Sequence, residues 1–190
     1  IKLDNADSKL LLNSITVGSV STSLANSGLD VDNNSTITAL SVGHITPVSI
    51  AASKSLSGAI TVTAGSLKLN ETGTLASAIA MSGGTLDADN SSTISGTLTH
   101  SGDIEIDVKA GEVLTYSGAA VSLGANTLTL SGGGTLGNTN ALVLNDAKSL
   151  LSLAGILTIG DVDGTAVSNT GKGILVSSSA TLGDYDLSAE

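Results

Sequence analysis

Short aliphatic pairs separated by polar residues recur along the chain at a fixed spacing. The segments LDVDNNSTI (29–37) and LDADNSSTI (86–94) are identical at seven of nine positions, and their starting positions, 29 and 86, differ by three times 19. Related segments begin at the two positions that this period predicts, Val48 and Leu67. The four units share the pattern Φ-x-Φ-x-x-x-x-[S/T]-Φ, where Φ is aliphatic or, once, Ala88. Self-similarity at such a period indicates a repeat architecture.

Apolar and polar residues alternate with a period of two inside each unit, which predicts β-strands rather than helices. The strands are short and are bounded by Asn, Asp, Ser and Gly, the residues typical of turns. Short strands that recur at this period predict an all-β fold, a single-stranded parallel β-helix whose rungs stack about 4.8 Å apart. We therefore expect about ten rungs in 190 residues, with inward columns such as Leu29, Val48, Leu67 and Leu86.

The repeats are regular over residues 29–103 and looser over 104–190, where copies begin at Ile106, Leu128, Leu142 and Ile174. Residues 1–190 are therefore interpreted as one β-solenoid domain or as a segment of a longer one. An unpaired strand edge at either end needs a cap or a neighbour. We expect end-to-end self-association or continuation into a longer chain.

Composition narrows the function classes. The chain has 7 basic residues, all Lys, against 17 acidic residues, and its net charge is -10. This balance makes nucleic acid an unlikely partner, because phosphate contacts use Arg and Lys. No segment approaches the ~20 apolar residues of a membrane span. The chain contains no Cys, Trp or Phe and only two Tyr, and a narrow stacked interior accounts for the scarcity of aromatic side chains.

The units LKLNETGTLAS (67–77), LDADNSSTISG (86–96) and LVLNDAKSLLS (142–152) resemble the repeats of filamentous haemagglutinin-type adhesins and autotransporter passenger domains. The resemblance implies a right-handed parallel β-helix that is extracellular or attached to the cell surface. It also implies adhesion or self-association, with a ligand on a host or neighbouring cell. The spacing alone does not determine the handedness.

Acidic residues gather on one predicted outer face. Stacking places Lys68 beside Asp87 and Asp87 beside Asp107, and further acids follow nearby. Carboxylate oxygens are the ligands that Ca²⁺ prefers, so a calcium site is one hypothesis and a solvated acidic face is the other. The candidate ligands are Asp87, Asp103, Glu105 and Asp107.

Two further patterns have a plain structural alternative. Asn33, Asn34, Asn70 and Asn90 begin N-x-[S/T] sequences, which are glycosylation acceptors, although Asn is also an ordinary turn residue. The eighth position of the unit carries a hydroxyl column that is either a hydrogen-bonded ladder or part of an ice-binding array. The column comprises Thr36, Ser55, Thr74, Thr93, Thr135, Ser149 and Thr181.

Signals for catalysis are weak. The two histidines, His44 and His100, have no distinctive partner, and His100 is predicted to be structural. Asp161 and Asp163 form a carboxylate pair of the kind that glycosidases use, in a segment that equally fits a turn. We therefore predict a structural or adhesive rod that is not an enzyme and holds no cofactor other than the hypothetical Ca²⁺. The alternatives are a polysaccharide-active β-helix enzyme and a surface-layer or ice-binding protein.

Overall fold

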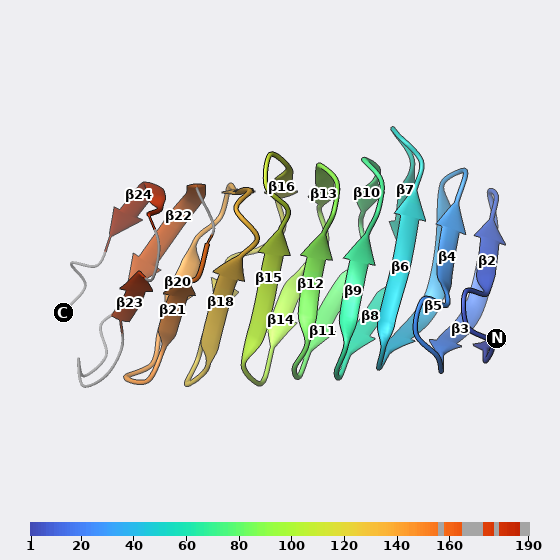
Figure 1. The fold of residues 1–190 in the computed structure, drawn as a ribbon, viewed down its shortest axis with the longest axis horizontal. Helices are drawn as coiled ribbons and strands as arrows, with labels where there is room; N and C mark the ends of the chain where they lie inside the picture. The colour runs from blue at the N-terminus through green and yellow to red at the C-terminus, as the bar shows by residue number, and fades with distance from the viewer. Residues whose placement is uncertain (156–157, 165–172, 177–178, 187–190) are drawn as a thin grey trace.

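The computed structural model describes residues 1–155, 158–164, 173–176 and 179–186. All regular elements of this part are β-strands, arranged in two sheets whose neighbouring strands run parallel. Sheet A has 15 strands and sheet B has nine. The rungs stack side by side along the long axis, and the two termini lie at opposite ends (Figure 1). The predicted all-β parallel solenoid is confirmed.

The strands of sheet B are β2 (Lys9–Leu12), β4 (Gly28–Val31), β6 (Ile45–Ile50), β9 (Ser66–Leu69), β12 (Thr85–Ala88), β15 (Ile104–Val108), β18 (Thr127–Ser131), β21 (Leu150–Leu153) and β23 (Gly173–Val176). The strands of sheet A are β1 (Lys2–Leu3), β3 (Thr16–Thr22), β5 (Ser35–Val42), β7 (Ser55–Ser57), β8 (Ala59–Val62), β10 (Thr74–Leu75), β11 (Ala78–Met81), β13 (Ser92–Ile94), β14 (Leu98–His100), β16 (Val113–Tyr116), β17 (Val121–Ser122), β19 (Thr135–Asn138), β20 (Leu142–Leu144), β22 (Thr158–Gly164) and β24 (Thr181–Asp186).

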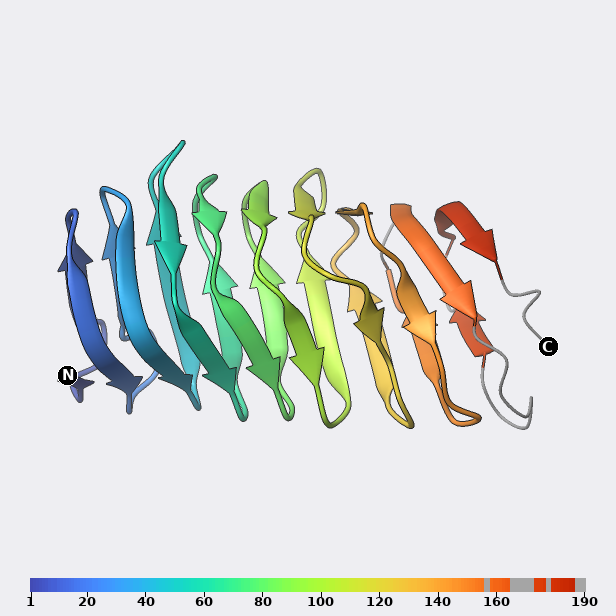
Figure 2. The ribbon, with the colours of Figure 1, turned by 180° about the vertical axis from the view of Figure 1, so that it is seen from behind.

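The solenoid is right-handed. In Figure 1 the chain rises through the strands of sheet B at the front, returns through sheet A behind them, and advances from right to left. The reverse view shows the strands of sheet A descending while the chain advances from left to right (Figure 2). In both views the direction in which the chain turns and the direction in which it advances define a right-handed helix.

The solenoid has about eight rungs, so the expected ten was wrong. Leu67 pairs with Leu86 in sheet B, an offset of 19 along the sequence, whereas Ile106 pairs with Leu130, an offset of 24. The pair that follows, Leu128 and Leu151, has an offset of 23. The later rungs contain more residues because their turns are longer, and 190 residues therefore form fewer rungs than a constant period of 19 predicts.

The interior is built from the aliphatic positions that the repeat predicted. In one unit Leu67, Leu69, Leu75, Ile79 and Met81 are all at most 2% exposed. Their counterparts in neighbouring rungs stack directly on them, as Leu67 does on Leu86 and Ile79 on Leu98. The void in the middle of the rod has a volume of about 10 Å³ and is lined by buried side chains, which is hardly enough space for one water molecule. Burial of these columns supplies the main driving force for folding.

The predicted column through Leu29, Val48, Leu67 and Leu86 is wrong at one step. Leu29 does pair with Val48, but Val48 then pairs with Leu69, and Thr46 takes the place opposite Leu67. Thr46 is completely buried, and its hydroxyl lies 2.8 Å from the hydroxyl of Thr22. A core tolerates an inward hydroxyl that is hydrogen-bonded. The repeat pattern did not predict Thr46 as an inward residue, because it counted only aliphatic side chains as inward.

Sheet A divides and rejoins along the rod. The long strand β5 pairs with both β7 and β8, and the long strand β22 pairs with both β19 and β20. Between them each rung has two short strands in sheet A, so the cross-section gains a third wall. Gly58, with φ of 134°, makes the first of these corners, and a Cβ there would meet the Ile37 carbonyl oxygen at 2.0 Å.

The third wall is interrupted between β14 and β17, which do not pair with each other. Tyr116 spans this break from inside the rod. Its hydroxyl donates a hydrogen bond to the Ala119 carbonyl at 2.6 Å and accepts one from the Leu98 amide at 3.1 Å. Tyr116 is only 3% exposed, so the interior does admit one aromatic ring where a wall is missing. Tyr116 to Asn126, whose structure the repeat left open, forms part of a long rung that includes β17.

Candidate functional surfaces

The outer face of sheet B carries the acidic strip, which consists of Asp87, Asp89, Glu105 and Asp107. Asp87, Glu105 and Asp107 alternate with buried side chains along β12 and β15, so the strand period turns them outward, and Asp89 directly follows β12. Asp87 pairs in register with Lys68 on one side and with Asp107 on the other, as predicted. The sequence pattern thus located this strip correctly.

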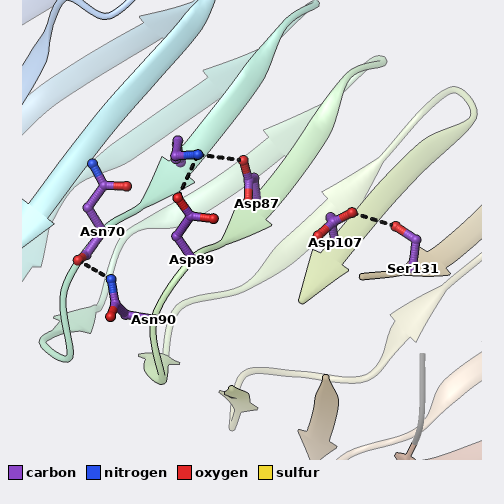
Figure 3. Close-up of polar contacts among 7 residues, drawn as sticks. Asn70, Asp87, Asp89, Asn90, Asp107 and Ser131 are labelled. Carbon is purple, nitrogen blue, oxygen red and sulfur yellow. Dashed lines mark hydrogen bonds and ion pairs between the residues drawn. The ribbon is translucent and has the colours of Figure 1, made fainter. Parts of the chain in front are cut away.

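Lys68 neutralises one end of the acidic strip. Its Nζ lies 2.6 Å from Asp89 Oδ2 and 3.4 Å from Asp87 Oδ2 (Figure 3). The hydrogen bond to Asp89 raises the pKa of Lys68 above its ordinary value. Partial burial raises the pKa of Asp87, and this effect outweighs the opposing influence of Lys68. The two shifts show that Asp89 is the stronger partner of Lys68, whereas Asp87 is less well compensated.

A hydroxyl lies between the other two acids of the strip. Ser131 Oγ is 2.6 Å from Glu105 Oε1 and 2.9 Å from Asp107 Oδ2, the latter contact being visible in Figure 3. A hydroxyl carries a single proton, so it donates to one carboxylate at a time. Glu105 Oε2 also accepts a hydrogen bond from Thr85 Oγ1 at 3.3 Å.

The candidate calcium ligands make contacts within the chain itself. Asp103 lies in the turn before β15, where its Oδ1 accepts a hydrogen bond from the Thr127 amide at 2.7 Å. Among the described residues, no group of three or more His, Cys, Asp or Glu side chains is arranged to hold a metal ion. Glu105 and Asp107 accept hydrogen bonds from Ser131, and Asp87 contacts Lys68. Calcium takes six to eight oxygen ligands, and its binding here stays a prediction.

The four asparagines proposed for glycosylation lie at the turns that follow β4, β9 and β12, and their side chains or backbones join adjacent rungs. Asn33 donates its amide to Asn13 Oδ1 at 2.7 Å, and Asn90 donates to the carbonyl of Asn70 (Figure 3). Asn34 Oδ1 accepts from the Ser55 amide at 2.9 Å. These contacts give the asparagines a structural role in the turns, and glycosylation remains a prediction.

The predicted hydroxyl column is divided into shorter ladders. Thr74 pairs with Ser55 and Thr93, as expected, but Thr36 pairs with Ser57 instead of Ser55. The hydroxyls of Thr36 and Ser57 are 2.9 Å apart. The hydrogen-bonded ladder is therefore present at this step, with a shifted register.

A different wall of the rod forms what we call the uncharged face, the outer surface of β8, β11 and β14. One column on it runs through Thr61, Ala80 and Thr99 and continues to Ser41 of the adjacent strand β5, in register. These residues are exposed, and the outward side chains of the three strands carry no charge. A shallow depression of about 270 Å³ lies here. The sequence pattern did not indicate this face, because the regular hydroxyls at the eighth position of the unit lie on another wall.

His100 closes the inward column at the edge of the uncharged face. It pairs in register with Met81, and its Nδ1 lies 3.0 Å from the Gly102 carbonyl oxygen. Its Nε2 is buried and has no hydrogen-bond partner. This inward position agrees with the predicted structural role. The side chains of Asp161 and Asp163, proposed as a carboxylate pair, lie outside the described part of the structure.

Comparison with protein-family models, curated proteins and solved structures found no match for this chain. In the described part of the chain, no helix has the length and apolar character needed to cross a membrane. The solenoid fold therefore stands on the structure itself, and the likeness to adhesin repeats stays a prediction from the sequence.

Proposed function

We propose that this chain is a structural and adhesive rod of an extracellular or cell-surface protein and acts without catalysis. The observation that carries the proposal is the unbroken ladder of sheet B. Its nine parallel strands join every rung to the next, and the interior columns beneath them are almost fully buried. Eight steps of about 4.8 Å give a stiff body roughly 40 Å long.

The surface fits a role outside the cell. A net charge of -10 keeps rods soluble and apart from one another in water. Repeat proteins present extended surfaces rather than one deep pocket, and the hollow on the uncharged face is shallow and open. A ligand on a host or neighbouring cell would contact such a surface over several rungs.

Labelling of intact source cells tests the location. An antibody raised against the folded chain should label cells without permeabilisation, and it should give no additional signal after permeabilisation. Labelling that requires permeabilisation would contradict an extracellular role.

Bead binding tests adhesion. Beads coated with the chain should adhere to cell surfaces more than beads coated with a Leu67→Asp variant, which places a charge in the interior and disrupts the fold. Equal adhesion of the two bead types would refute adhesion by the folded rod. Release of reducing sugars from polysaccharides would instead support the enzyme alternative.

The uncharged face favours ice binding as a second candidate function. Its threonine, serine and alanine side chains repeat at the strand spacing of about 4.8 Å on a wall that carries no charge. Thermal hysteresis of the purified chain tests this candidate. A Thr61→Lys variant should lose hysteresis while a Thr129→Lys variant on sheet B retains it. Absence of hysteresis in the unmodified chain would exclude ice binding.

A further inference from the structure

The first and the last strand of sheet B each expose a leucine on their outer face. Leu11 faces outward from β2 and is 58% exposed, and Leu175 faces outward from β23 and is 54% exposed. Their in-register neighbours one rung further in are polar, Asp30 beside Leu11 and Ser152 beside Leu175. Outward leucines on these terminal strands are therefore a departure from the polar outer columns that they extend.

Among the residues that the structure describes, both terminal strands of sheet B also have a free edge. β2 pairs only with β4, and within the described residues β23 pairs only with β21. β1 covers the later part of the neighbouring edge, because Lys2 pairs with Ser21 and the Ile1 ammonium donates to the Ser19 carbonyl at 2.7 Å. The uncovered edge at this end therefore comprises β2 and the beginning of β3. Such an edge is a template for another strand.

The two ends complement each other in side-chain direction. On β2, Leu10 and Leu12 face inward and Leu11 faces outward. On β23, Ile174 and Val176 continue the inward columns of Leu151 and Leu153. Val176 is 57% exposed, although Leu153, directly beneath it in the same column, is 1% exposed. One more rung would bury Val176 in the same way.

The spacing to the next wall also fits. Ile174 and Leu182 are eight positions apart, and Leu10 and Val17 are seven apart. The chain already stacks these two spacings on each other, because Leu29 and Ile37, eight apart, lie in register on Leu10 and Val17. The spacing between the two walls therefore allows the last rung to stack on the uncovered edge, β2 and the beginning of β3.

We propose that copies of this chain stack head to tail, with β23 of one copy pairing in parallel with β2 of the next. In this register Ile174 lies on Leu10, Leu175 on Leu11 and Val176 on Leu12. The contact is heterologous, so it leaves one free end on each side and propagates into a filament. The inference rests on the proposed role as a structural rod, to which it adds the partner and the register.

Two complementary blocked variants test the direction of stacking. In sedimentation velocity, the unmodified chain should grow from its 18.5 kDa monomer into a ladder of multiples with rising concentration. Leu11→Asp and Leu175→Asp should each stay monomeric alone, because every contact needs both leucines. An equimolar mixture should form dimers and nothing longer, since one competent end remains on each copy. The matched control Val113→Asp, at an exposed position in the middle of the rod, should assemble normally.

Cysteine cross-linking tests the register and does not depend on how the charged variants fold. The chain contains no cysteine, and parallel neighbours lie within disulfide range. A mixture of Leu11→Cys and Leu175→Cys copies should oxidise mainly to the mixed dimer, whereas Val113→Cys with either should not. Dimers of two Leu11→Cys copies, or a monomer at all concentrations, would overturn the proposal. If the chain stays monomeric while the antibody still labels intact cells, stacking is overturned and the proposed rod function stays in place.

Discussion

Replacing Tyr116 with phenylalanine removes one buried hydroxyl and retains the ring. The hydroxyl bonds Leu98 N and Ala119 O across the break between β14 and β17. Leu98 is 3% exposed, so its amide cannot turn to water once the hydroxyl is gone. Ala119 is exposed, and its carbonyl can be hydrated instead.

The cost is therefore dominated by the Leu98 amide. A buried donor without a partner costs about 1–3 kcal/mol, and we expect the free energy of unfolding to fall by that amount. For a chain of this size the melting temperature should drop by roughly 3–10 °C. Urea denaturation followed by far-ultraviolet circular dichroism measures the first quantity, and a thermal scan measures the second.

Two additional readouts separate the hydroxyl from general damage. Hydrogen exchange of the Leu98 amide should accelerate in Tyr116→Phe, while amides of sheet B keep their protection. Burial raises the pKa of Tyr116, so the folded state resists ionisation and loses stability as the pH rises above about 10. The phenylalanine variant should lack this component of alkaline destabilisation.

Ser117→Ala serves as the matched control, because it removes a hydroxyl from the next residue, which is exposed. It should change stability by less than about 0.5 kcal/mol. If Tyr116→Phe behaves like Ser117→Ala in denaturation and in Leu98 exchange, the hydroxyl does not close the break in the wall.

Four further substitutions test the core and the acidic strip by urea denaturation. Leu86→Ala should cost about 2–5 kcal/mol, because Leu86 is 1% exposed in a stacked column; a cost below about 1 kcal/mol would contradict tight packing. His100→Leu should stabilise the chain by about 1 kcal/mol, because it removes the unpartnered Nε2, and a loss of stability would show that the bond to Gly102 matters more. Lys68→Ala should cost about 0.5–1 kcal/mol at low salt and less at about 1 M salt, and an effect independent of salt would argue against ion pairing. Since burial raises the pKa of Asp87, its ionised form disfavours folding above that pKa, and Asp87→Asn should be at least as stable as the parent at about pH 7 but gain less on acidification.

The repeat unit predicted the fold class and the inward positions because both follow from side-chain periodicity. The same periodicity found the neighbours Lys68, Asp87 and Asp107, since in-register stacking follows directly from a constant rung length. It did not predict that Thr46 enters the core, because two hydroxyls that satisfy each other inside a rod look like surface residues in the sequence. The register shift at Val48 reflects a longer rung, because Val48 pairs with Leu69 at an offset of 21 positions, whereas Leu67 pairs with Leu86 at an offset of 19.

Chance similarity misled the assignment of the unit at Leu142. The segment resembles the unit at Leu67, but Leu142 lies in β20 of sheet A, and the rung it belongs to enters sheet B at β18. An alternating aliphatic strand looks the same on any wall of a solenoid. Only backbone pairing shows to which wall a strand belongs. The break that Tyr116 spans and the uncharged face likewise became visible only from the strand pairing.

The short offset between stacked strands has a consequence for how the chain acquires its structure. Paired residues in sheet B are 19 to 24 positions apart, about one tenth of the 190-residue chain. That ratio is typical of fast-folding helical bundles and lies well below the values of most β-proteins. Each completed rung offers an ordered edge on which the next stretch of chain can settle, so folding can proceed directionally as the chain emerges from a ribosome or an export channel. A β-protein built in this way escapes the slow search for distant partners that its secondary structure would otherwise impose.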